Sequence, residues 1–301
     1  MLPAETRQLL LEDPGALPNT LSRAVGWLAL WDALLDGEVT APSMLEAALI
    51  FLESDADPLL TERILDDLRT AFWRVATEAE RENAAERLEA SLWRKLQSDP
   101  ANRASTFQAY VDIARTPKAV GRLEKLWRLE LEIPGLPLAE KDFRLLALEL
   151  GVREIEGWRK ILDEQTERIT QPDRKAQFLF VRPALDADPE TRGRFFASLG
   201  QAENRAREPW VLEALEYLHH PLRAETSEAY LQQSLEWLEE IQRTGDIFFP
   251  KRWLDRTFAG HRSAEAAATV RTFLAERPDY PKRLRGKILQ ASDILLRVQP
   301  E

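Results

Sequence analysis

The segment TEAERENAAERLEASLWRKLQSDP, residues 77–100, carries the pattern that decides the fold. It opens with a capping box, because the Thr77 hydroxyl can accept from the third helical amide while Glu80 reaches back to the Thr77 amide. Apolar residues then recur with a helical period, at Ala85, Leu88, Leu92 and Leu96. This spacing predicts a helix that begins after Thr77, ends near Asp99 and buries one face.

Similar signals for helix starts and helix ends recur along the chain. A capping residue followed by proline favours a helix start, because proline presets φ and lacks an N–H that would be unpaired there anyway. Four such pairs occur, at Asp57-Pro58, Asp99-Pro100, Thr116-Pro117 and Asp188-Pro189. Glycines stand where helix ends are expected, at Gly37, Gly151, Gly200 and Gly260. The sequence therefore predicts a chain of individually capped helices.

Between these predicted helix starts and ends, apolar residues recur with a helical period. They comprise Leu60, Ile64, Leu68 and Phe72; Leu231, Leu235, Leu238 and Ile241; and Leu284, Ile288, Ala291 and Leu295. Residues 21–35 carry two stripes, one of Leu21, Val25, Leu28, Trp31 and Leu35 and one of Trp27, Leu30 and Leu34. We expect that helix to be buried on two sides. The best strand candidate, DIFF at residues 246–249, is short.

Capped helices with short links, one of them apolar on two faces, are typical of stacked antiparallel helix pairs. We therefore predict an all-α fold, a superhelical array of antiparallel helix pairs resembling armadillo or HEAT α-solenoids. No fixed period recurs, so a regular repeat protein is not supported.

The predicted domain organisation is simple. Residues 1–20 are expected to form a connecting tail, and residues 21–301 a single all-α domain. The stretch EIPGLPL, residues 132–138, interrupts the helical pattern. It is a candidate hinge between two half-solenoids, and the alternative is an ordinary turn between helices.

Composition excludes several classes of function. Lys and Arg total 41 against 51 Asp and Glu, a net charge of -10, and there is no cysteine. This balance argues against nucleic acid as a partner, because phosphate contacts need a concentrated basic surface. No apolar run approaches the roughly 20 residues of a membrane span, and the first residues do not form a secretory signal. We expect a soluble chain, cytoplasmic or periplasmic, without a membrane partner.

Two of the three histidines are adjacent, His219 and His220 in YLHHPLR (217–223). Successive helical residues point about 100° apart and cannot easily share one ion. A turn at Pro221 could relax this restriction, but a third ligand would have to come from a distant carboxylate. We favour a helix C-terminus, where the imidazoles and Arg223 complement the negative dipole end. His261, after Gly260, is interpreted as a linker histidine, so we predict no metal site in this chain.

Other catalytic signatures are absent from the sequence. There is no Gly-x-Gly-x-x-Gly, no Walker A loop and no Gly-x-Ser-x-Gly elbow. Carboxylate pairs such as Glu239-Glu240 are expected by chance among so many acids. We therefore predict no catalytic residue and no cofactor in this chain.

Basic residues cluster in the C-terminal half, at Arg205, Arg207, Arg223, Lys251 and Arg252. Arginine holds carboxylates in a planar fork, so a concave helical surface with these residues could grip the carboxylate end of a peptide. Arg207, Arg223 and Arg252 are the candidate substrate-binding residues. The alternative is ordinary surface arginines, with stems packed on Trp210 and Trp253.

Several segments resemble the C-terminal helical domain of the aminopeptidase N family of zinc metallopeptidases, shared with the endoplasmic-reticulum aminopeptidases, in a bacterial form. They are LSRAVGWLALWDALLDGEV (21–39), QTERITQPDRKAQFLFVRPALDADPETRGRFFASL (165–199), NRAREPWVLEALEYLHHPLR (204–223), TGDIFFPKRWLDRTFAGHRS (244–263) and DYPKRLRGKILQASDILLR (279–297). The family's His-Glu-x-x-His helix, its downstream glutamate ligand and its Gly-x-Met-Glu-Asn loop are absent. In the family these belong to a separate, upstream catalytic domain.

The resemblance implies a non-catalytic domain that caps the catalytic domain and shapes the peptide-binding chamber. Its implied partners are the upstream zinc-peptidase domain of the same polypeptide and the peptide substrate, and zinc is implied only for that parent domain. The alternatives are a free-standing α-solenoid that binds a protein or peptide, and an independent enzyme that uses His219 and His220.

Overall fold

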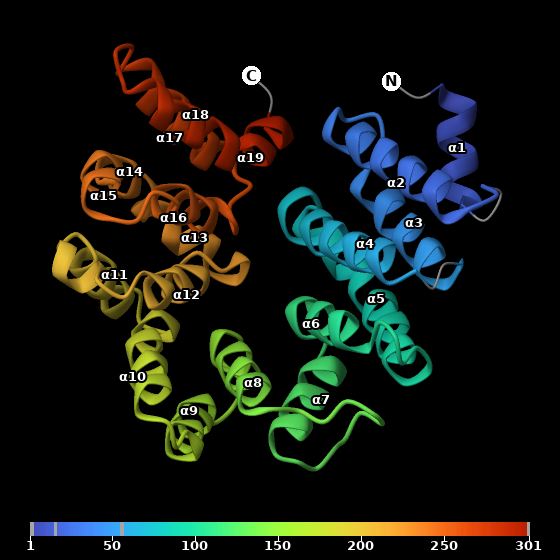
Figure 1. Ribbon diagram of the computed structural model, residues 1–301, viewed down its shortest axis with the longest axis horizontal. Coiled ribbons are helices and arrows are strands. Elements are labelled where there is room, and N and C mark those ends of the chain that lie inside the picture. The colour runs from blue at the N-terminus through green and yellow to red at the C-terminus, as the bar shows by residue number, and fades with distance from the viewer. Residues whose placement is uncertain (1–2, 15–16, 55–56, 300–301) are drawn as a thin grey trace. The chain divides into compact units, whose positions relative to one another are not determined.

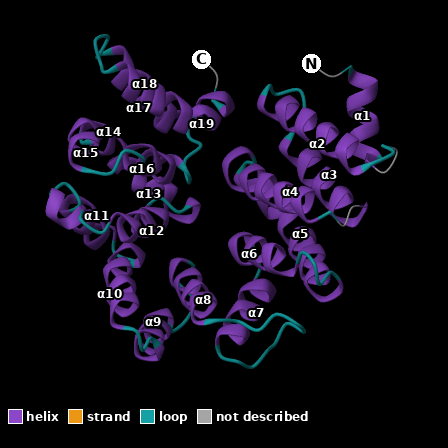
Figure 2. Ribbon diagram, viewed as in Figure 1, coloured by secondary structure: helices purple, strands orange, loops and turns teal. Residues whose placement is uncertain are grey.

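The computed structural model describes residues 3–14, 17–54 and 57–299. Within these ranges the chain consists of helices joined by turns and loops (Figures 1 and 2). Helices close in sequence pack as contacting pairs. The strand candidate DIFF forms a turn that leads into a helix. The all-α class predicted from the sequence is therefore confirmed.

The chain divides into two compact units, Met1–Ala139 and Glu140–Glu301. The first unit contains α1 (Ala4–Glu12), α2 (Thr20–Leu35), α3 (Ala41–Ser54), α4 (Pro58–Thr70), the π-helical turn η2 (Ala71–Val75), α5 (Glu78–Ser98), α6 (Arg103–Ile113) and α7 (Pro117–Trp127). Within it α5 packs against α6 and α3, and α4 packs against α6.

The second unit is built in the same way. It contains α8 (Glu140–Val152), α9 (Trp158–Arg168), α10 (Pro172–Val181), η3 (Arg182–Leu185), α11 (Pro189–Ser198), η4 (Ala202–Arg205), α12 (Glu208–Leu218), η5 (Pro221–Arg223), α13 (Ala224–Ser227), η6 (Glu228–Tyr230), α14 (Leu231–Glu236), α15 (Leu238–Thr244), α16 (Phe249–Phe258), α17 (Ala264–Ala275), α18 (Lys282–Ala291) and α19 (Asp293–Val298). Helix α8 packs against α9, and α16 contacts both α12 and α18.

Most predicted helix starts are confirmed by their hydrogen bonds. The capping box at Thr77 makes both of its bonds, and proline occupies the first turn of α4, α7 and α11. The caps of those three helices, Asp57, Thr116 and Asp188, each accept from backbone amides of the first turn. At the other end of a helix, Gly37 follows α2 with a φ of 74°, where glycine avoids strain.

Two predicted helix boundaries are wrong. Asp99-Pro100 does not start a helix, because the Asp99 carboxylate is engaged by the backbone and side-chain amides of Asn102 and by Lys95. A short loop results, and α6 begins only after Asn102. Gly151 lies inside α8 rather than after it. In both cases a residue that commonly marks a helix boundary does not mark one here.

Helix α2 is buried on one side rather than two. Trp27 and Leu30 are fully buried, and the indole N–H of Trp27 donates to the Asp67 carboxylate at 2.8 Å. Leu21, Val25 and Leu28 are exposed by 75%, 59% and 46%. The prediction that both stripes are buried is therefore wrong for the first half of α2, because no described helix of the first unit covers that face.

The predicted tail contains a helix, and the predicted hinge contains none. Residues 1–20 include α1, which contacts α2 and α3, while residues 1, 2, 15 and 16 lie outside the described part. Residues 132–138 contain no helix, and the division between the two units follows at Ala139. The tail, the single domain and the hinge remain predictions.

Candidate functional site

The segment YLHHPLR ends α12 as predicted, but its histidines are not solvated there. His219 is the C-cap of α12, and Pro221 opens the short helix η5. Both imidazoles are buried, with exposed fractions of 1% and 6%. Burial holds the pKa of His219 and of His220 well below the usual histidine range. Both rings are therefore neutral near pH 7 and do not complement the helix dipole as cations.

His219 pairs with the third histidine of the chain. Nδ1 of His219 and Nε2 of His261 lie 3.0 Å apart and share one hydrogen bond. The rings of Phe196 and Tyr230 meet the His219 ring nearly at right angles. His261 lies in the link between α16 and α17, as interpreted, but its ring pairs with His219 rather than facing solvent. His261 is fully buried and ties the turn after α16 to the end of α12.

This pairing depends on Gly260. An ideal Cβ added to Gly260 would lie 1.9 Å from the carbonyl oxygen of His219. No side chain can occupy that space, so glycine allows the backbone of the turn to approach the end of α12 closely. The approach brings His261 within hydrogen-bonding distance of His219.

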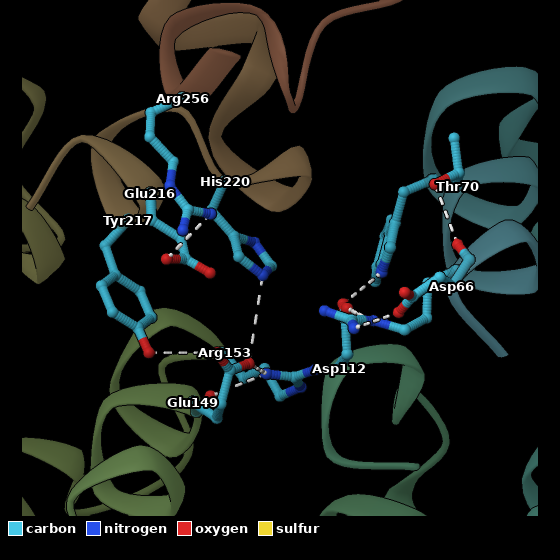
Figure 3. Close-up of polar contacts among 11 residues, drawn as sticks. Asp66, Thr70, Asp112, Glu149, Arg153, Glu216, Tyr217, His220 and Arg256 are labelled. Carbon is cyan, nitrogen blue, oxygen red and sulfur yellow. Dashed lines mark hydrogen bonds and ion pairs between the residues drawn. The ribbon is translucent and has the colours of Figure 1, made fainter. Parts of the chain in front are cut away.

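His220 faces a different polar group, shown in Figure 3. Its Nε2 lies 4.0 Å from a carboxylate oxygen of Glu149 on α8, and the Tyr217 hydroxyl donates to the other oxygen at 3.2 Å. Arg153, one helical turn after Glu149, forms an ion pair with the same carboxylate. The network joins the end of α12 to α8 inside the second unit.

Hydrogen bonding assigns the tautomer of His220. The backbone N–H of Leu222 donates to Nδ1 at 3.2 Å, so Nδ1 carries no proton. In the neutral ring the proton therefore sits on Nε2, which faces Glu149. After burial, the nearby Arg153 and Arg223 guanidinium groups lower the pKa of His220 further. Burial also raises the pKa of Tyr217 well above its usual range, and the Glu149 carboxylate adds to this effect.

These contacts leave no chelating arrangement at the adjacent histidines. His219 faces His261, whereas His220 faces Glu149, whose carboxylate already pairs with Arg153. Among the described residues, no group of three His, Asp or Glu side chains is placed to hold a metal ion. The arrangement joins helices and presents no reactive group to solvent.

The three candidate arginines are not brought together at one site. Arg207 and Arg223 flank opposite ends of α12, which spans roughly 16 Å at 1.5 Å per residue. Arg207 lies 3.4 Å from Asp173 and stacks over the Trp210 ring, whereas Arg223 is largely buried and paired with Glu154. Arg252 on α16 is exposed and forms no ion pair within the described ranges. Their role in substrate binding remains a prediction.

A separate polar cluster lies within the first unit and is also drawn in Figure 3. Asp112 on α6 accepts from the Trp73 indole N–H at 2.8 Å and pairs with Arg69 on α4. Arg69 also approaches Asp66 at 3.4 Å, and the Thr70 hydroxyl donates to the Asp66 carbonyl. This cluster joins α4 to α6 and, like the first one, is a structural contact.

The sequence interpretation missed Glu149 and Arg153, and it placed Gly260 at a helix end without its close approach to His219. One signal was available for Glu149, which stands inside the apolar run LLALELGV (145–152). A carboxylate in such a run is a candidate for a buried, paired charge, because acids are almost never fully buried alone. Nothing local identifies the close approach at Gly260, since its constraint comes from His219 far along the chain.

The buried histidines predict that the chain loses stability as pH falls below about 6.5. In the unfolded chain these imidazoles take up protons near that pH, while the folded pKa values are lower, so protonation favours unfolding. Stability is retained above about pH 6.5 and declines toward the folded pKa values, by up to about 1.4 kcal/mol per pH unit for each histidine. Urea unfolding from about pH 7.5 to about pH 5 measures this decline.

A matched variant separates the histidines from other titrating groups. Burial raises the pKa of Glu213, which gives stability that is lost as pH rises, opposite in sign to the histidine effect. We therefore compare the chain with His219→Gln, in which one of the titrating imidazoles is removed. The variant should show a shallower decline with falling pH, and equal slopes would contradict the assignment.

No protein-family model matches the chain, and no curated protein matches it. No helix within the described ranges is long and apolar enough to cross a membrane.

Proposed function

We propose that this chain is a non-catalytic C-terminal helical domain of a zinc aminopeptidase, which caps the catalytic domain and shapes the peptide-binding chamber. The proposal rests on the resemblance of five segments to that domain. One structural observation bears on the non-catalytic character of the proposed domain. Two of those segments, residues 204–223 and 244–263, meet through the His219–His261 hydrogen bond and the close approach of Gly260. The most distinctive residues of the chain thus serve packing rather than chemistry.

In this proposal the partners are an upstream zinc-peptidase domain of the same polypeptide and the peptide substrate. Zinc belongs to the parent domain, and this chain holds no cofactor. Among the arginines proposed to meet the peptide, Arg252 is the best placed, because it is exposed and forms no ion pair among the described residues. Arg223 is less suited, since Glu154 and the Leu185 carbonyl already engage its guanidinium group.

The proposal predicts that the purified chain is inactive alone. It should not hydrolyse amino-acid anilides and should not contain stoichiometric zinc by elemental analysis, because the buried histidines are engaged with protein groups. Chelator-sensitive hydrolysis by the purified chain would contradict the proposal and would favour an independent enzyme. An inactive chain distinguishes the proposal from that enzyme but not from a binding scaffold.

The second candidate is a free-standing α-solenoid that binds a protein or peptide. The observation that favours it is the exposed apolar stripe of Leu21, Val25 and Leu28 on α2, because such stripes commonly mark a surface that packs on a partner. The same stripe would suit a neighbouring domain of a longer polypeptide. The reading frame upstream of the chain separates the two candidates.

A further inference from the structure

Helix α18 carries an unusual charge pattern for an acidic chain. Its sequence KRLRGKILQA holds four basic residues and no acidic one, namely Lys282, Arg283, Arg285 and Lys287. Arg285 donates to the Leu274 carbonyl at 3.1 Å, and Lys287 donates to the Gln242 side chain at 2.7 Å. None of the four forms an ion pair within the described ranges, and Lys282 and Arg283 are exposed.

The position of these cations is unfavourable for the helix itself. Lys282 and Arg283 occupy the first two positions of α18, where the helix dipole is positive and anions are preferred. The N-cap residue, Pro281, provides no side-chain hydrogen bond to the first turn. The two cations therefore cost stability in the isolated chain, and an anionic partner would remove that cost.

An apolar groove lies beside this row of cations. It has a volume of about 680 Å³ and is lined by Ile247, Phe248 and Leu284 together with Arg283 and Lys287. Ile247 and Phe248 are exposed by 69% and 64%, which is high for large apolar side chains. The groove therefore combines an apolar floor with a basic edge, both within the second unit.

We propose that this groove binds an acidic segment of a partner protein. A large apolar side chain of that segment packs against Ile247 and Phe248, and flanking carboxylates pair with Lys282 and Arg283. Charge complementarity identifies the occupant, because the exposed cations have no carboxylate of their own chain within ion-pairing distance among the described residues. Arg207, Arg223 and Arg252 do not line the groove, and the proposal does not depend on the proposed function.

A protein segment fits the groove better than a lipid surface or a nucleic acid. The groove is concave and of the size that holds side chains, whereas a membrane surface is read by a broad basic face. Glu239 also lines the groove, and the whole chain has a net charge of -10, so a continuous array of phosphates would be repelled. A short segment with few carboxylates avoids that repulsion.

The test uses three fluorescein-labelled peptides and measures binding by fluorescence anisotropy. One contains Glu and Asp alternating with Leu and Phe, the second replaces the acids by Lys, and the third replaces Leu and Phe by Ser. The full chain should bind the first peptide at least about tenfold more tightly than either of the others. Raising NaCl from about 0.05 M to about 0.5 M should weaken that binding, because the carboxylate contacts are exposed.

Variants then locate the site. Arg283→Glu and Phe248→Ser should each weaken binding of the acidic peptide by about tenfold or more. Lys118→Glu is the matched control, because Lys118 is an exposed lysine at the second position of α7 in the first unit. Its affinity should stay within about twofold of the unchanged chain.

Stability provides an independent readout of the same substitutions. Because Arg283 opposes the helix dipole, Arg283→Glu should raise the melting temperature of the chain while it weakens peptide binding. The proposal would be overturned by equal binding of the three peptides or by an unchanged affinity in Arg283→Glu. Binding to phosphatidylserine vesicles but to none of the peptides would also overturn it. Weakened binding by a variant that melts at or above the temperature of the unchanged chain would support it.

Discussion

The Gly260→Ala variant is expected to lose about 3 kcal/mol or more of unfolding free energy. The added methyl group would lie 1.9 Å from the His219 carbonyl oxygen and 3.0 Å from the carbonyl carbons of His219 and His220. All three are backbone atoms, so no side chain can rotate away to relieve the clash. The turn after α16 would have to move and the His219–His261 hydrogen bond would be lost. Urea unfolding measures the loss.

Gly286→Ala is the control for this experiment. Gly286 lies in the interior of α18, is exposed, and has no atom within 4 Å of an added Cβ. Alanine has the higher helix propensity, so the control should gain about 0.5–1 kcal/mol. A Gly260→Ala variant as stable as the unchanged chain would mean that the turn and α12 do not pack as described.

The Glu149→Gln variant is expected to lose about 3 kcal/mol. The substitution keeps an oxygen that can accept from Tyr217 but removes the charge that compensates Arg153. The side chains of Glu149 and Arg153 are only 9% and 5% exposed, so the guanidinium group would stay buried after the Glu149 charge is lost. Removing a carboxylate partner from a buried cation is costly in a medium less polar than water. Urea unfolding again measures the effect.

An exposed pair of the same spacing is the matched control. Glu190 and Arg194 are also four residues apart on one helix, but their side chains are 80% and 64% exposed. Glu190→Gln should therefore cost less than about 1 kcal/mol. Adding Arg153→Met to Glu149→Gln should recover part of the lost stability, because the buried cation that lost its Glu149 partner is removed. Equal losses at Glu149 and Glu190 would show that burial does not strengthen the Glu149 contact.

Local features of the sequence predicted the all-α fold well. Capping side chains and helical apolar periods act within a few residues, so Thr77, Asp57, Thr116 and Asp188 start helices as expected. The failures arose where a partner distant in sequence decides the outcome. Leu21 and Val25 have the period of a buried stripe, yet only the opposite face of α2 is covered.

The histidine cluster could be predicted only in part. Pro221 and the adjacent polar residues correctly indicated the end of α12. The sequence could not show that His261 would meet His219, because that contact joins residues 42 positions apart. The neutral state of the rings follows from burial, which depends on tertiary packing rather than on residue type.

The nucleotide sequence directly upstream of the chain tests the proposed function most directly. A non-catalytic domain of a zinc aminopeptidase should be encoded in one continuous frame with an upstream His-Glu-x-x-His motif, because the zinc helix of the family lies in a preceding domain. We expect sequencing of that region to show this frame and motif. An in-frame stop codon immediately before Met1, with no such motif in frame, would contradict the proposal and favour a free-standing binding scaffold.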